Sequence, residues 1–175
     1  MSLKISELNR FLVSGKMHFE RREESRHTGY LVRIDGRALG LPTLLRVSHG
    51  GGDAAFNNLK GVAQALGLSV RELLTAEKCK LSRECVLIML CVSLLDFSFQ
   101  RRAMLRDKQE GTDGIRAMVE SVMLILKELE NPIKKPWTGE ELKVFTRIST
   151  CLKRWELDPL IADAARVLIK LSSRG

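Results

Sequence analysis

Apolar residues in the second half of the chain recur every three or four positions, which is the spacing of helices that bury one face. The strongest segment runs from Cys85 to Phe99 and is apolar without interruption as far as Val92. We expect it to form a central helix that is buried on most sides. A second amphipathic segment opens at Thr112 and stops at Asn131–Pro132, where the proline cannot continue a helix.

Two further helices are expected before the C-terminus, and capping signals mark where they begin. Thr138 and Glu141 form a capping box, in which each side chain accepts a hydrogen bond from the backbone of the other residue. Asp158–Pro159 is a typical N-cap and first-turn pair for the last helix. Antiparallel helices joined by short turns form a bundle, so residues 81–175 are expected to be a helical bundle for self-association or partner binding.

The first 80 residues follow a more varied pattern. A short helix over residues 5–13 precedes the segment 16–35, whose alternating and β-branched residues predict a small β-hairpin. Residues 39–48 are predicted to form a short helix that starts at Pro42. A later helix ends at Gly67, which suits a left-handed C-cap residue, and a capping box of Ser69 and Glu72 opens the next helix.

Composition places the chain among folded globular proteins of one domain or two small ones. Of its 175 residues, 45% are hydrophobic and 29% are charged, which excludes a disordered or collagen-like chain. The 29 Lys and Arg exceed the 21 Asp and Glu and leave a formal net charge of +8. This excess, shared between residues 1–80 and 81–175, favours a polyanionic partner.

One stretch of the first region carries a family resemblance. The run from Pro42 to Gly50, then Ala65-Leu66-Gly67 and the capped Ser69 helix with Glu72-Leu73-Leu74, resembles the second half of the lambda-repressor-like helix-turn-helix DNA-binding domain. The resemblance covers residues 39–74. It implies that residues 43–49 form a recognition helix, which is an element that fits the major groove. The nucleic-acid-binding candidates are then Thr43, Arg46, Ser48, His49 and Lys60.

The predicted fold class is therefore mainly α. Residues 1–80 form a helix-turn-helix-like, nucleic-acid-binding region with a small β-hairpin, and residues 81–175 form the bundle. Paired cations outside the motif are further candidates for phosphate contacts. They are Arg101 with Arg102, Lys134 with Lys135, Arg21 with Arg22, and Lys153 with Arg154.

Two functional interpretations follow. The first is a non-enzymatic nucleic-acid-binding regulator of transcription, a homo-oligomer with DNA as the favoured partner over RNA. The second is a compact helical viral or accessory protein that binds partner proteins or coats RNA and ribonucleoprotein without sequence specificity. It is supported by the strand-like residues 31–38, which stand where the family has a helix pair.

The sequence gives no sign of catalysis. No G-x-S-x-G elbow or phosphate-binding loop occurs, so no catalytic residue, cofactor or small-molecule substrate is predicted. The four cysteines, Cys79, Cys85, Cys91 and Cys151, form no C-x-x-C pair, so we expect reduced thiols and no metal site. The first residues lack an apolar stretch of signal-peptide length, and we expect an intracellular protein, cytoplasmic or nucleoid-associated, without a membrane partner.

Overall fold

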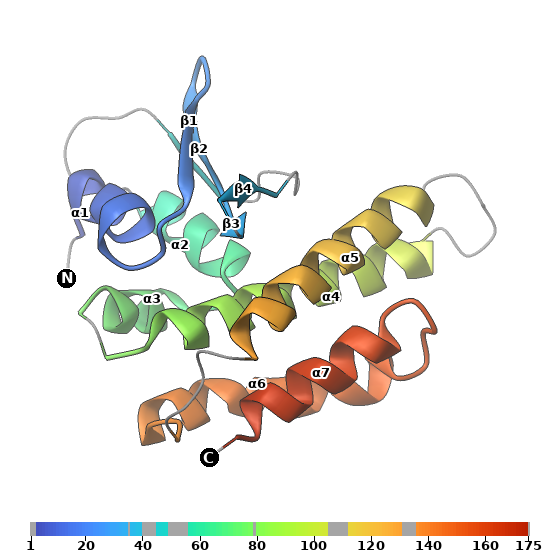
Figure 1. Ribbon diagram of the computed structural model, residues 1–175. Coiled ribbons are helices and arrows are strands. Elements are labelled where there is room, and N and C mark those ends of the chain that lie inside the picture. Colours follow the sequence, from blue (N-terminus) through green and yellow to red (C-terminus); the bar gives the residue numbers. More distant parts are fainter. Residues whose placement is uncertain are drawn as a thin grey trace. The chain divides into compact units, whose positions relative to one another are not determined.

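Helices make up most of the described part of the chain, so the predicted mainly α class is confirmed. The computed structural model describes residues 3–34, 36–39, 45–48, 56–78, 80–104, 112–130 and 136–174. It divides into two compact units, which we call unit 1 (Met1–Val86) and unit 2 (Leu87–Gly175) and describe separately (Figure 1).

Unit 1 contains the short helices α1 (Ile5–Arg10), α2 (Phe56–Ala65) and α3 (Val70–Glu77), and α1 continues into the π-helical turn η1 (Phe11–Gly15). The predicted capping box at the start of α3 is confirmed. Ser69 Oγ accepts a hydrogen bond from the Glu72 backbone N–H at 3.2 Å, and the Glu72 carboxylate accepts one from the Ser69 N–H at 2.7 Å. Gly67, which follows α2, has a φ of +70°, in the left-handed region predicted for it.

A three-stranded antiparallel sheet accompanies these helices. Its order is β1 (Glu20–Glu23), β2 (His27–Leu31) and β5 (Leu45–Ser48), and β5 packs against α2. β1 and β2 form the hairpin predicted within residues 16–35, and its turn stands clear of the helices of unit 1 (Figure 1). Next along the chain, β3 (Arg33–Ile34) and β4 (Arg37–Ala38) form a two-stranded sheet around Gly36, whose φ is +75°.

The prediction of a short helix over residues 39–48 is wrong for the residues of this range that the structure describes. Leu45–Ser48 form strand β5, which pairs with β2 so that Val47 lies opposite Thr28. Two physical reasons favour the strand. First, apolar and polar residues alternate from Leu45 to Ser48, and the edge of β2 offers hydrogen-bond partners to their backbone. Second, a helix of about ten residues is only marginally stable without support from tertiary contacts. Val47 is buried in this arrangement.

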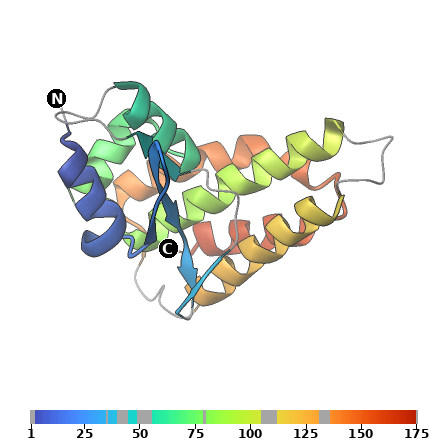
Figure 2. The same cartoon turned by 90° about the horizontal axis from the view of Figure 1, so that it is seen from above.

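Unit 2 is built from four helices in its described residues, and the sequence predicted each of them. They are α4 (Arg83–Met104), whose first turn belongs to unit 1, α5 (Thr112–Leu129), α6 (Gly139–Trp155) and α7 (Ala162–Ser172). α7 packs against both α5 and α6, and Figure 2 shows the unit from a second direction. The capping box at Thr138 is confirmed, with Thr138 Oγ1 accepting from the Glu141 N–H at 3.3 Å. α7 starts at Ala162, later than predicted, although the Asp158 carboxylate accepts a hydrogen bond from the Leu160 N–H at 3.0 Å, as an N-cap side chain does.

The core of unit 2 is apolar and aromatic. Residues 85–91 of α4, of which 87–91 belong to unit 2, are all buried, as predicted for this helix. Trp155 is fully buried, and Trp137 stacks edge-on against Phe145 with ring centroids 5.0 Å apart. The Trp137 indole N–H donates to the carbonyl oxygen of Leu171 at 3.0 Å and so ties the lead into α6 to the end of α7. None of the described helices combines the length and the hydropathy that a bilayer crossing requires.

Candidate nucleic-acid interface

The predicted nucleic-acid-binding residues fall into three groups. Thr43 and His49 lie outside the described residues. Arg46 and Ser48 lie in strand β5, so the predicted recognition helix is not formed by residues 45–48. Lys60 is exposed on α2, where it stays a candidate contact.

Of the paired cations, Lys134 and Lys135 lie outside the described residues, whereas Arg101 and Arg102 occupy the last turn of α4. Arg101 is exposed. The Arg102 Nε lies 3.6 Å from Asp158 Oδ2, and the Asp158 side chain is only 10% exposed. A carboxylate that is largely withdrawn from water needs a counter-charge, so Arg102 has a structural role in linking α4 to the turn before α7.

The pairing of β5 with β2 brings two arginine positions into one row of the sheet. Arg22 on β1 lies opposite Gly29 on β2, and Gly29 in turn lies opposite Arg46 on β5. Residues that are directly opposed in antiparallel strands share one face of the sheet. The row therefore places positions 22 and 46 on the same face, on either side of a residue without a side chain.

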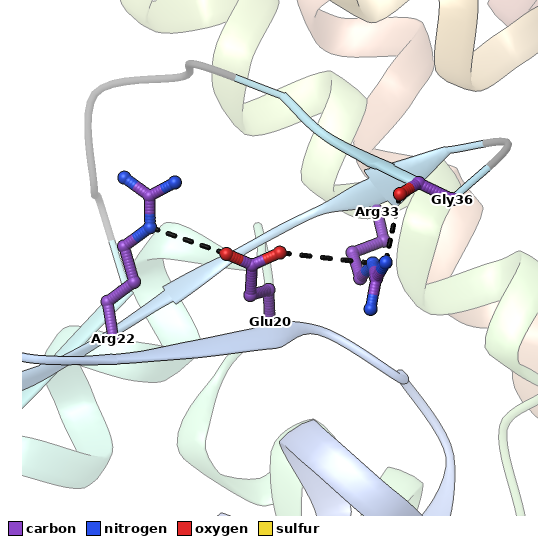
Figure 3. Close-up of polar contacts among 4 residues, drawn as sticks. All are labelled: Glu20, Arg22, Arg33 and Gly36. Carbon is purple, nitrogen blue, oxygen red and sulfur yellow. Dashed lines mark hydrogen bonds and ion pairs between the residues drawn. The ribbon is translucent and has the colours of Figure 1, made fainter.

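A carboxylate holds a second arginine close to Arg22. The Glu20 Oε1 lies 3.5 Å from Arg22 Nε, and its Oε2 lies 3.9 Å from Arg33 Nε (Figure 3). Arg33 also donates from Nη2 to the Gly36 carbonyl at 2.9 Å. The terminal nitrogens of Arg22 point away from Glu20 in Figure 3, and the side chains of Arg22 and Arg33 are 60% and 48% exposed. Such exposed ion pairs contribute little stability, but here they bring two guanidinium groups to one carboxylate.

We call Arg22, Arg33 and Arg46 the unit 1 arginine cluster. It lies largely within a basic segment, because residues 25–52 contain four Arg and a single acidic residue, Asp35. Sequence pattern alone proposed Arg22 and Arg46 separately and missed Arg33. The signal that could have joined them is the alternation in Leu45-Arg46-Val47-Ser48, which predicts a third strand beside the hairpin.

The opposite face of the sheet has matched charges and a buried tyrosine. Arg21 Nη2 lies 2.5 Å from Glu23 Oε1, and Thr28 Oγ1 donates to Glu23 Oε2 at 3.3 Å. Tyr30 is 2% exposed, and its hydroxyl has no hydrogen-bond partner among the described residues. Burial raises the pKa of Tyr30 above its ordinary value of 10.0, while Arg21 lowers that pKa and Glu23 raises it.

Tyr30→Phe is expected to keep or raise the free energy of unfolding at neutral pH, by up to about 1 kcal/mol, because it removes an unpaired buried hydroxyl. The parent protein should lose stability as the pH rises past the unfolded pKa of about 10, since the folded chain then holds the phenol proton more tightly than the unfolded chain does. Tyr30→Phe has no phenol proton at this position, so it should not show this part of the alkaline loss of stability. Denaturant unfolding of both proteins at about pH 7 and about pH 11 checks this, and an equal alkaline loss would contradict it.

Thiols and acidic groups form no metal centre among the residues that the structure describes. No group of three or more His, Cys, Asp or Glu side chains there could hold a metal ion. Cys85 and Cys91 are buried and form no disulfide with a described residue, and burial raises the pKa of the Cys91 thiol, which keeps it neutral. Cys151, on α6, is half-buried.

Large exposed apolar side chains in unit 2 are the described feature that bears on self-association. They are Phe97, Met104, Leu124, Leu142 and Leu157. Single exposed apolar residues are common on monomeric proteins, so they do not define an interface. Self-association stays a prediction.

Comparison with known proteins adds no relative: no family model, curated protein or solved structure matches the chain. The geometry of the unit 1 arginine cluster is therefore the basis for the function proposed next.

Proposed function

We propose that this chain is a non-enzymatic protein that binds nucleic acid through phosphate contacts made by the unit 1 arginine cluster. The single observation that carries the proposal is the row formed by Arg22, Gly29 and Arg46, with Arg33 joined to Arg22 through Glu20. Guanidinium groups offer several N–H donors in a planar fork that matches phosphate oxygens, so clustered arginines favour a phosphate-rich partner.

The mode of binding follows from the strand. A recognition helix would read base edges in the major groove, but residues 45–48 form β5. Contacts to phosphates position a protein on nucleic acid without reading its sequence. The proposal therefore keeps nucleic acid as the partner and favours binding without sequence specificity. A role in transcription would require base readout by other residues.

The net charge of +8 supports the same partner. DNA and RNA share the phosphodiester chemistry on which the proposal rests. The experiment below distinguishes DNA from RNA as the partner.

The test is a fluorescence-anisotropy titration of the full chain with random-sequence single-stranded RNA and a random-sequence DNA duplex, at salt concentrations from about 50 to about 200 mM. We call the slope of log affinity against log salt concentration the salt slope. Three arginine contacts alone predict a salt slope of about −2 to −3. Polyglutamate is the control, since it offers carboxylates in place of phosphates.

The outcomes separate the candidate functions. Binding of both nucleic acids with a steep salt slope supports the proposal, and binding of RNA alone supports the accessory, RNA-coating interpretation. Much tighter binding of one duplex sequence than of random duplex would show base readout. If neither nucleic acid binds more tightly than polyglutamate, the proposed function is wrong.

A further inference from the structure

We infer that the outward side of α6 is a second phosphodiester-binding surface, carried by unit 2. The surface consists of Lys143, Arg147, Lys153 and Arg154, and we call it the α6 cationic face. The inference deepens the proposed function and rests on it for the identity of the ligand. It uses none of the residues of unit 1.

Helical spacing aligns three of these cations. Lys143, Arg147 and Arg154 stand at positions i, i+4 and i+11, so their Cα atoms fall within about 40° of one another around the helix axis. Lys143, Lys153 and Arg154 are exposed, and Arg147 is half-buried. The opposite side of α6 holds the buried residues Val144, Phe145, Ile148 and Trp155, which fixes the orientation of the helix.

We call the aligned Lys143, Arg147 and Arg154 the stripe, and it is long enough to contact several phosphates of one strand. From Lys143 to Arg154 the helix rises about 16 Å. This distance corresponds to about five nucleotides of one strand along a duplex axis. A flexible single strand can adjust its phosphates to the same stripe.

Charge sets α6 apart from α5 and α7. Residues 142–155 contain four cations and no Asp or Glu. On α7, Arg166 pairs with Asp163, and α5 mixes Arg116 and Lys127 with Glu120 and Glu128. One ion pair on α6 joins Lys143 Nζ to Glu140 Oε1 at 3.5 Å, with side chains 76% and 58% exposed. Water and salt screen such a pair, so it leaves Lys143 able to bind a phosphate.

The polar composition of the face favours nucleic acid over an anionic lipid surface. A helix that lies in a membrane interface carries large apolar residues along its buried side. The outward side of α6 instead carries the exposed hydroxyl residues Thr146, Ser149 and Thr150 between its cations. Leu142, at 47% exposure, is the large apolar residue exposed within this helix.

The test compares two triple variants of the full chain in the anisotropy titration. The first carries Lys143→Gln, Lys153→Gln and Arg154→Gln, which change only exposed residues and use a good helix former. Removing three contacts is expected to flatten the salt slope by about 2 to 3. The matched control carries Arg116→Gln, Lys127→Gln and Lys170→Gln, which remove the same charge from exposed positions on α5 and α7. We expect the control to keep most of the parental slope.

A second readout locates the ligand without relying on affinity. Cys151 lies on α6, and its Sγ is 3.9 Å from Arg154 Nη2. In a Cys79→Ser background, bound RNA or DNA should slow alkylation of Cys151, because Cys85 and Cys91 are buried and contribute little. Retained protection of Cys151 in the control triple variant, and lost protection in the α6 triple variant, are the expected results.

The results distinguish failure of this inference from failure of the proposed function. If the α6 triple variant keeps the parental slope while substitutions in the unit 1 arginine cluster reduce it, the inference is wrong and the proposed function stands. If only the α6 triple variant loses binding, the second surface stands and the proposed role of unit 1 fails. The inference is also wrong if the control triple variant loses as much binding as the α6 triple variant. It is equally wrong if the α6 triple variant loses binding to phosphatidylserine vesicles but keeps its binding to RNA and DNA.

Discussion

The double substitution His27→Cys and Ser48→Cys is expected to produce a disulfide between the two introduced thiols under mild oxidation. His27 and Ser48 are direct partners in the β2–β5 ladder. Opposed Cα atoms in antiparallel strands are about 4.5 to 5.5 Å apart, within the range that a disulfide spans. The cross-link would close a loop of 22 residues and raise the free energy of unfolding by about 3 kcal/mol.

The control for this cross-link is the double substitution Thr28→Cys and Ser48→Cys. Moving one partner by a single residue places the two thiols on opposite faces of the sheet. Mass spectrometry of peptides measures both yields, with Cys151→Ser and Cys79→Ser in every sample. A cross-link in the test pair alone supports strand β5, whereas no cross-link, or equal yields in both pairs, would support a different conformation of residues 45–48.

Local signals in the sequence predicted the helices well. The capping boxes at Ser69 and Thr138 satisfy backbone groups within four residues, so their effect is independent of the rest of the fold. The apolar run from Cys85 to Val92 likewise predicted a helix that is buried on most sides. In each case, the interactions that define the element lie close together in the sequence.

Strand β5 could not be predicted in the same way. Its partner β2 lies between 15 and 21 residues earlier, from Tyr30↔Leu45 to His27↔Ser48, and that pairing supplies hydrogen-bond partners to the backbone of Leu45–Ser48. The sequence from Pro42 to Gly50 matched a helix-turn-helix pattern because Pro and Gly are typical residues at the starts and ends of helices in many folds. Propensity gives way to tertiary contacts in such short segments.

The candidate site was predictable residue by residue but not as an assembly. Arg22 and Arg46 were each identified from the sequence, yet only the strand register puts them in one row. Arg33 was missed because its link to Arg22 runs through Glu20, across two strands. The phosphate contact predicted for Arg102 stays a prediction, and its pair with Asp158 could not be predicted because it depends on the turn between α6 and α7.

The double substitution Arg22→Ala and Arg33→Ala is expected to flatten the salt slope by about 1.5 and to weaken binding to every nucleic acid sequence alike. Each substitution removes one phosphate contact, together with the release of counterions that this contact causes. Both side chains are largely exposed, and their ion pairs with Glu20 are weak, so the free energy of unfolding should change by less than about 1 kcal/mol. Circular dichroism during denaturant unfolding checks this second expectation.

The matched control is Arg71→Ala with Lys80→Ala, which removes the same charge from exposed positions of unit 1 outside the cluster. It separates a general effect of net charge from contacts made at the sheet. We expect this control to stay close to the parental slope.

The salt dependence of nucleic acid binding by these two double variants is the most direct test of the proposal that unit 1 binds phosphates through its sheet. The account predicts a clearly shallower salt slope for Arg22→Ala with Arg33→Ala and a nearly parental slope for Arg71→Ala with Lys80→Ala. Equal slopes for the two variants and the parent would contradict it.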